Sequence, residues 1–339
     1  MSADLRLNAL NHWVTTHAAG RAFTLSPASA DASFRRYFRL EYADNHATQI
    51  VMDAPPDKED CAPFVHASDV FAAAGLHVPA LLAQDFQQGF LLLEDLGRTT
   101  FLDALQRDDA TTPDALYGAA IGALVKLQCA SQASVFPDYD AALLMRELQL
   151  FPAWYLRVHL GIDIDAALTQ SIETVFARIV ANNLAQARVF VHRDYHSRNL
   201  MVCTPLPGVI DFQDAVYGPI TYDLVSLLRD AYVQWPEARV LDWCIRFWEQ
   251  ARAAGLPVPT DFACFHQDFE WMGLQRHLKV LGIFARLAHR DGKTRYLDDI
   301  PMVLSYARTV AKRYRDLHPL VAVLDRAAGQ PTPRVGLSF

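Results

Sequence analysis

Apolar positions divide the chain into a shorter part with strand-like runs and a longer part with helical periodicity. In the first part, residues 4–19 and 62–74 carry apolar side chains at helical spacing. Short apolar runs predict strands at residues 36–42, 49–52 and 90–93. The segment 26–33 consists mostly of small residues, and we expect a loop there. The pattern predicts a small, β-rich lobe over residues 1–95.

From residue 99 onward the spacing of apolar positions is mainly helical. The predicted helices are 99–107, 113–132, 141–159, 165–187, 221–234, 237–254, 261–288 and 300–327. One β-rich interruption lies at 189–212, and the last ten residues, 330–339, are expected to form a tail. The whole chain is therefore predicted to be an α+β protein with two lobes, the second spanning 96–339.

Composition narrows the function classes. Of 339 residues, 52% are hydrophobic and 20% charged, which is typical of a globular protein, and the net charge of −7 argues against a nucleic-acid binder. The five cysteines are scattered without a C-x-x-C pair, as expected in a reducing compartment. Neither a signal peptide nor an apolar run of membrane-spanning length is visible. We therefore expect a cytoplasmic protein that does not bind membranes.

The main candidate catalytic residues lie in the stretch 191–202, Val-His-Arg-Asp-Tyr-His-Ser-Arg-Asn-Leu-Met-Val. It reads as strand, loop, strand, and the loop holds Asp194 and, five positions later, Asn199. Asp211 follows at the end of another apolar run. Phosphoryl transfer needs a carboxylate that orients and deprotonates the attacking hydroxyl, together with oxygen ligands for magnesium. The order and spacing match the kinase pattern H-R-D-x-x-x-x-N followed by D-F-G, except that Gln213 replaces the glycine.

Other interpretations of these residues are weaker. A lone Asp or Asn in a loop is usually a cap or turn residue. His192 and His196 beside Asp194 could suggest zinc, but the ligand spacing is wrong, and His192 is better explained as a structural hydrogen-bonding group. A P-loop nucleotide site would need G-x-x-x-x-G-K-[ST], which the sequence lacks. A protein kinase would need an A-P-E segment after Asp211, which is also missing.

The set of motifs resembles the aminoglycoside phosphotransferase and choline kinase branch of the protein-kinase-like fold, in order along nearly the whole chain. The resemblance implies that Asp194 is the catalytic base, that Asn199 and Asp211 bind Mg²⁺, and that ATP is the co-substrate. The segment 218–224, Gly-Pro-Ile-Thr-Tyr-Asp-Leu, resembles the family's G-D-P-x-x-D-L stretch. By that match Asp223 is a structural acid that supports the catalytic loop.

The resemblance also implies a nucleotide site. Leu92-Leu-Glu-Asp-Leu-Gly97 is similar to the family's hinge, in which the backbone of Glu94 and Leu96 would bind the adenine edge. Small residues up to Ser33 would let backbone N–H groups approach the phosphates, although this loop has no glycine. Met52 stands near the place of the family's strand lysine. We consider Arg35 or Arg36 as the cation that replaces this lysine at the phosphates.

Within this branch, three segments look most like the anomeric kinases for N-acetylmuramate and N-acetylglucosamine in bacterial cell-wall sugar recycling: L-L-L-E-D-L-G, V-H-R-D-Y-H-S-R-N-L and I-D-F-Q-D-A-V-Y-G-P. Such an acceptor could be bound by Asp214, and an acidic group on it by Arg276 and Lys279. The same residues also fit a solvated face beside a core of Trp271, Leu274 and Leu278. Two alternatives remain: a kinase of an amino alcohol or aminoglycoside, and a nucleotide-binding pseudokinase, which the missing lysine would favour.

Overall fold

The computed structural model describes residues 4–30, 34–107 and 112–329. Contacts divide the chain into two compact units. The sheet unit comprises the chain up to Ala104 together with Asn199–Asp214, and the helical unit comprises Leu105–Arg198 and Ala215 onward. The predicted β-rich beginning and helical remainder are confirmed, whereas the predicted lobe boundary at residue 95 stays a prediction. None of the described helices is both long enough and apolar enough to cross a bilayer.

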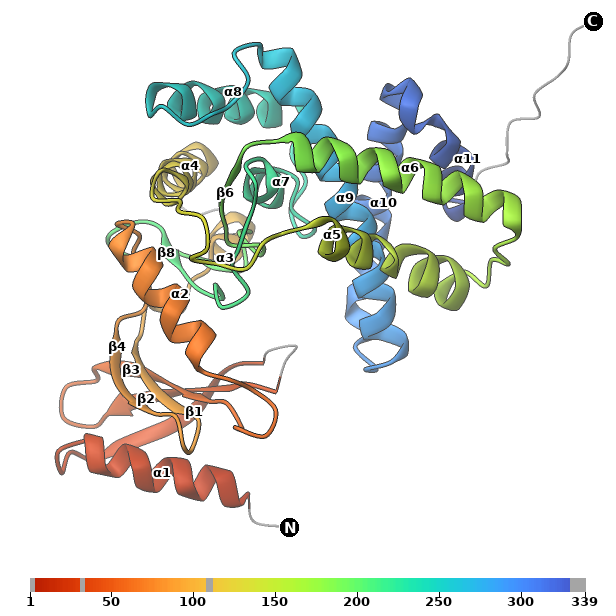
Figure 1. Cartoon of the computed structure of the whole chain (residues 1–339). Helices are drawn as coiled ribbons and strands as arrows, with labels where there is room; N and C mark the ends of the chain where they lie inside the picture. Colours follow the sequence, from red (N-terminus) through yellow and green to blue (C-terminus); the bar gives the residue numbers. More distant parts are fainter. Residues whose placement is uncertain (1–3, 31–33, 108–111, 330–339) are drawn as a thin grey trace, which may run out of the picture. The chain divides into compact units, whose positions relative to one another are not determined.

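The sheet unit is built on one antiparallel sheet with strand order β1-β2-β3-β5-β4. Its strands are β1 (Phe23–Ala30), β2 (Arg36–Tyr42), β3 (Thr48–Asp53), β4 (Leu81–Asp85) and β5 (Phe90–Glu94). Helices α1 (Leu5–His17) and α2 (Ala62–Ala73) lie on opposite sides of this sheet (Figure 1). The predicted loop at 26–33 is wrong for 26–30, which form the end of β1. β4 was not predicted, because its alternating pattern is only five residues long.

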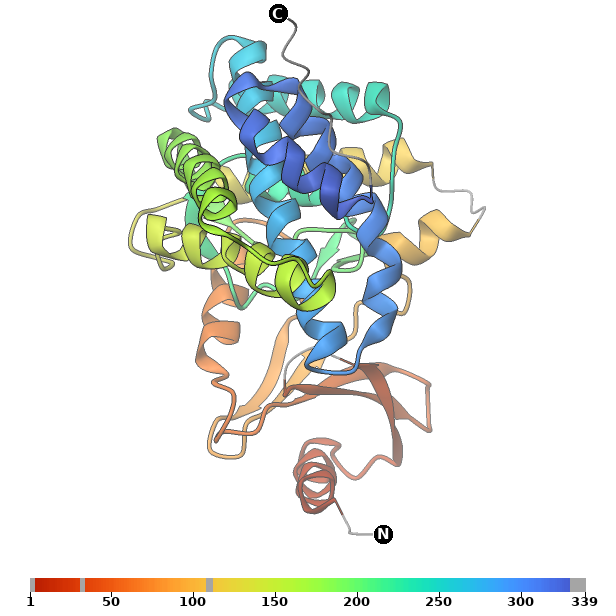
Figure 2. The ribbon, with the colours of Figure 1, turned by 90° about the vertical axis from the view of Figure 1, so that its right-hand side faces the viewer.

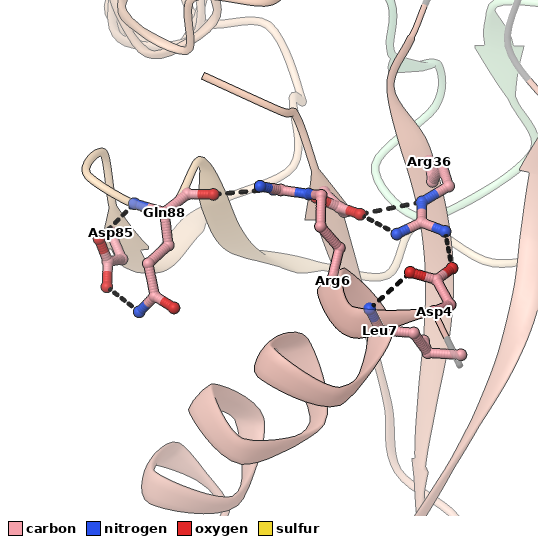
Figure 3. A network of polar contacts seen from close by, with 7 residues as sticks. Asp4, Arg6, Leu7, Arg36, Asp85 and Gln88 are labelled. Carbon is pink, nitrogen blue, oxygen red and sulfur yellow. Dashed lines mark hydrogen bonds and ion pairs between the residues drawn. The ribbon is translucent and has the colours of Figure 1, made fainter. Parts of the chain in front are cut away.

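An apolar core and an ion-pair network hold α1 against the sheet. Leu10, Trp13 and Val14 of α1 pack with Leu40, Val51 and Leu92 of the strands. Fully buried Asp53, at the end of β3, accepts hydrogen bonds from Arg6 of α1 and Arg36 of β2. Asp4 caps the helix by accepting from the N–H of Leu7 at 3.0 Å, and it also pairs with Arg36 (Figure 3).

In the helical unit the other helices surround one long helix, α9 (Phe262–His289) (Figure 2). Residues 269–282 of α9 are all buried. Around it lie α4 (Pro113–Cys129), α5 (Ala141–Leu148), η1 (Phe151–His159), α6 (Ala166–Ala185), α7 (Tyr222–Leu228), α8 (Glu237–Ala253), η2 (Thr294–Asp299), α10 (Ile300–Arg313), η3 (Arg315–Leu320) and α11 (Val321–Ala327). Helix α3 (Phe101–Gln106) spans the boundary between the units.

Three helix predictions in this unit need correction. The predicted helix 141–159 is α5 followed by the π-helix η1, which begins at Phe151 with Pro152 as its second residue. At Gly282 of α9 an added Cβ would lie 2.4 Å from the backbone of Leu150, so the segment before η1 packs too closely for a larger residue. The predicted helix 221–234 already ends at Leu228, and 300–327 divides into α10, η3 and α11. The expected tail at 330–339 lies outside the described residues.

Candidate active site

The loop that carries Asp194 follows strand β6 (Arg188–Val191), which pairs with β9 (Val216–Pro219) in the helical unit. The carboxylate of Asp223, buried at the start of α7, accepts the N–H of His192 at 2.6 Å and of Arg193 at 3.0 Å. The N–H of Asp194 donates to Nδ1 of His192 at 3.2 Å. Arg193 adopts a left-handed φ of 76°, which costs a non-glycine residue about 1–3 kcal/mol. Asp223 and His192 therefore hold a strained backbone that presents Asp194.

A buried carboxylate that the sequence did not reveal lies beside this loop. Glu147 of α5 accepts from Arg193 at 2.6 Å and from Nζ of Lys279 at 3.0 Å, and the hydroxyl of Tyr139 also donates to it. Lys279 further donates to the Tyr222 hydroxyl at 3.0 Å. In the sequence, the only indication of this role was that Glu147 shares an apolar helix face with Leu144 and Leu148. In many helices an acid at such a position has no function.

This cluster affects the charge of Asp194, which is half-buried. Burial by itself raises the pKa of Asp194, but the opposing charges, led by that of Lys279, outweigh it and lower the pKa below its usual value. Asp194 is thus a carboxylate at neutral pH. For Asp223, burial dominates over the two backbone hydrogen bonds and raises the pKa to about 7.

The far end of the loop is anchored by Asp230, a second buried acid that the sequence analysis missed. It accepts hydrogen bonds from the N–H of Ser197 at 3.0 Å and from the Ser197 hydroxyl. The sequence offered only an acid two residues after the apolar helix α7. The loop is therefore fixed at both ends by carboxylates that accept backbone N–H groups.

Asn199 and Asp211 lie together in the sheet unit, where β7 (Leu200–Met201) pairs with β8 (Gly208–Val209). Nδ2 of Asn199 donates to one carboxylate oxygen of Asp211 at 2.9 Å, and Nε2 of Gln213 donates to the other at 2.9 Å. Asp211 has a left-handed φ of 67°. Phe212, which follows it, packs against the rings of Phe64 and Phe71 of α2. An amide oxygen and a carboxylate at this spacing form a ligand set that suits Mg²⁺.

The predicted hinge is held in shape by Arg39 of β2. Its guanidinium donates to both carboxylate oxygens of Asp95 and, at 2.7 Å, to the carbonyl of Gly97, whose φ is 101°. The N–H of Glu94 donates to the carbonyl of Ala80 within the sheet unit, so this N–H already has a hydrogen-bond partner. Among the described residues, neither the N–H nor the carbonyl of Leu96 has a hydrogen-bond partner.

The remaining predicted residues differ in their surroundings. Ser33 lies outside the described residues, and Asp214 is exposed. Arg276 and Lys279 are buried in α9, with 3% and 8% of their surfaces exposed, so the solvated-face interpretation is wrong for both.

The two arginines considered as substitutes for the missing lysine lie in different surroundings, and only Arg36 is excluded by its position. Met52 is fully buried on β3. Arg36 is paired with Asp53 in the register, so these two side chains share the sheet face of α1, while Met52 points to the other face. Arg36 is therefore on the wrong face to replace a lysine at position 52. Arg35 forms an ion pair with Glu59 at 3.1 Å.

Comparisons with known proteins agree with the sequence motifs. The model of the phosphotransferase enzyme family matches residues 24–258. An N-acetylmuramate/N-acetylglucosamine kinase of Neisseria meningitidis is 49% identical over 97% of this chain and 98% of its own length. Its namesake from Pseudomonas aeruginosa is 48% identical over 96% and 97%, and that from Caulobacter vibrioides 33% over 81% and 84%. The resemblance noted in the sequence is confirmed.

Solved structures agree on the fold. A choline/ethanolamine kinase family protein from Mesorhizobium loti superposes with a TM-score of 0.61 at 12% identity, covering 95% of this chain and 99% of that one. An ADP-bound aminoglycoside phosphotransferase gives a TM-score of 0.55 at 14% identity, covering 90% and 98%. At such low identity these similarities speak for the fold alone, and they confirm the predicted α+β kinase-like architecture.

Proposed function

This chain belongs to the phosphotransferase enzyme family, and we propose that it is an ATP-dependent kinase which phosphorylates the anomeric hydroxyl of N-acetylmuramate, N-acetylglucosamine or both. The observation that carries the proposal is the 48–49% identity, over nearly the full length of both chains, to kinases named for these sugars. The product would be a sugar 1-phosphate, made during recycling of peptidoglycan.

In the proposed reaction Asp194 accepts the proton of the sugar hydroxyl as its oxygen attacks the γ-phosphorus of ATP, while the bond from this phosphorus to the β,γ-bridging oxygen breaks and ADP leaves. Its lowered pKa supports this role, because the carboxylate is ready to accept a hydrogen bond from the hydroxyl at neutral pH. Asp223 and His192 would act as positioning residues by fixing the backbone of Asp194. No covalent enzyme intermediate is required, since positioning and charge stabilisation account for most catalysis of this type.

The proposed metal ligands are Asn199 and Asp211. When bound, Mg²⁺ would neutralise charge on the phosphate oxygens. In the chain itself, the amide of Gln213 keeps the Asp211 carboxylate in place, and Phe212 anchors the adjacent backbone in the packing of α2. Within the described residues no group of three or more His, Cys, Asp or Glu side chains could hold a metal, so protein ligands here would be completed by phosphate and water.

For the nucleotide we propose that the carbonyl of Glu94 and the N–H of Leu96 bind the adenine edge. The unpaired backbone of Leu96 and the clamp of Arg39 on Asp95 and Gly97 support this role. Ser33 stays a proposal for the phosphates. We propose that Asp214 and Arg276 bind the acceptor. Lys279 already contacts Glu147 and the Tyr222 hydroxyl, so it would influence the acceptor site only through its charge.

We place this reaction in the cytoplasm, where ATP is available and thiols stay reduced. All five cysteines are free, which supports a reducing compartment.

The test is to incubate the protein with MgATP and each sugar and to identify the product by NMR. We expect phosphorus coupled to the anomeric proton. A sugar 6-phosphate would still show a sugar kinase, but it would contradict phosphorylation at the anomeric hydroxyl. Turnover of choline or an aminoglycoside with neither sugar reacting would favour the other acceptor classes, and nucleotide binding without any turnover would favour a pseudokinase.

A further inference from the structure

Arg276 is a buried cation that forms no direct ion pair among the described residues. Four Arg and Lys side chains of the described residues are less than 9% exposed: Arg39, Arg229, Arg276 and Lys279. Three of them contact a carboxylate directly, namely Asp95, Glu270 and Glu147 respectively. Within the described part of the chain, the guanidinium of Arg276 makes no hydrogen bond and no ion pair, and its Nη1 is both shielded from solvent and unpartnered.

An unpaired buried charge is costly. Removing a guanidinium from water without a counter-ion carries a penalty of several kcal/mol, which folded proteins normally offset with a carboxylate and hydrogen bonds. The other buried cations of this chain follow that rule. The exception at Arg276 therefore points to a partner that does not belong to the chain, and an anion is the partner that a guanidinium requires.

The surroundings of Arg276 show where this partner would bind. Arg276 stands one helical turn before Lys279 on α9, and its charge acts on Asp194, Asp223, His196, Tyr232 and His277. Asp223 forms neither a hydrogen bond nor an ion pair with Arg276, and its carboxylate instead accepts two backbone N–H groups. All of these groups belong to the helical unit, which also contains the proposed base.

We infer that Arg276 binds the carboxylate of an acidic amino sugar and thereby sets the preference of this chain for a sugar acid over its neutral counterpart. The inference rests on the proposed function, since it assumes that a sugar is oriented on Asp194. The planar fork of a guanidinium matches a carboxylate with two parallel hydrogen bonds. A neutral sugar offers no such group, so it would leave the guanidinium of Arg276 without an ion-pair partner.

The test compares the parent with Arg276→Met on three acceptors: N-acetylmuramic acid, its methyl ester and N-acetylglucosamine. Since a hydrogen bond to a charged group contributes roughly 1.5–3 kcal/mol, kcat/KM for the free acid should fall by about 10–100-fold relative to the neutral sugar. The parent should lose a similar factor when the acid is replaced by its ester. In Arg276→Met, acid and ester should react equally well.

Arg286→Met is the matched control. Arg286 lies on the same helix, and its buried Nε also has no hydrogen-bond partner, but Arg286 is not among the charges that act most strongly on Asp194. The control should keep the parent's ratio of acid to neutral sugar. Thermal melting of both variants separates misfolding from lost recognition, and Arg276→Lys, which keeps the charge, should recover part of the ratio.

Two results would overturn the inference. An equal loss of kcat on all three acceptors would show that Arg276 serves the transferred phosphoryl group, and an unchanged ratio would show that it binds no acceptor acid. If the parent phosphorylates none of the sugars, the proposed function fails instead. Calorimetric binding of the free acid against its ester still tests Arg276 in that case, because binding needs no phosphoryl transfer.

Discussion

Replacing Asp223 by alanine should disable the reaction without touching any group proposed to contact substrate. The side chain is fully buried and accepts the N–H of His192 at 2.6 Å and of Arg193 at 3.0 Å. In Asp223→Ala both N–H groups lose their acceptor. The left-handed backbone of Arg193, with φ of 76°, loses the bonds that hold it.

The size of the effect follows from these contacts. Each buried N–H left without a partner costs about 1–3 kcal/mol, so the free energy of unfolding should fall by roughly 2–6 kcal/mol. Relaxation of Arg193 would move the neighbouring Asp194, and a shift of about 1 Å can slow a reaction by ~100-fold. We therefore expect kcat to fall by about two orders of magnitude, while ATP affinity changes little.

The assay measures kcat, KM and nucleotide affinity separately, alongside denaturant unfolding. Asp268→Ala is the control, because Asp268 is a partly buried acid of the same unit that accepts the side-chain amide of Asn182 at 3.2 Å instead of the loop backbone. The Asp268→Ala variant should lose little activity. Asp223→Asn retains one acceptor oxygen and should lie between the parent and Asp223→Ala. Parent-like kcat in a folded Asp223→Ala protein would refute the reasoning.

Four further predictions follow from the same contacts. Asp194→Asn removes the proton acceptor, so turnover should fall at least about 100-fold with nucleotide binding intact; near-normal turnover would exclude Asp194 as the base. Asp211→Ala should abolish activity and not be restored by extra magnesium, whereas MgATP binding equal to the parent's would make Asp211 a structural acid. Burial raises the pKa of Asp223 from 3.8 to about 7, so the folded chain binds more protons in that interval. The contribution of Asp223 to the free energy of unfolding should therefore decrease as pH rises from about 4 to 7, so urea titrations should show the stability difference between the parent and Asp223→Ala narrowing over this range; a constant difference would contradict the shift. Asp53→Asn should lower the free energy of unfolding by ~1–3 kcal/mol, because two guanidinium groups lose a charged acceptor (Figure 3); an unchanged urea midpoint would show that the network contributes nothing.

Several features of this protein could be predicted from the sequence because they depend on residues close together in the chain. The alternation of apolar positions gives β2 with its observed bounds, Arg36–Tyr42. The spacing of Asp194 and Asn199, with Asp211 after a further strand, is a local pattern, and it is sufficient to indicate a phosphotransferase. Helix α9 is predicted within a residue or two, because its apolar positions recur over many turns.

Other features depend on contacts between distant residues. The end of β1 is rich in small residues with little strand preference, and it becomes a strand because it pairs with β2. Glu147 joins Arg193, forty-six residues away, and Lys279. Their sequence positions give no indication of that cluster. Whether a charged residue on α9 is solvated, paired or left without a partner is likewise decided by what packs around it, and this is why tertiary structure alone separates Arg276 from Lys279.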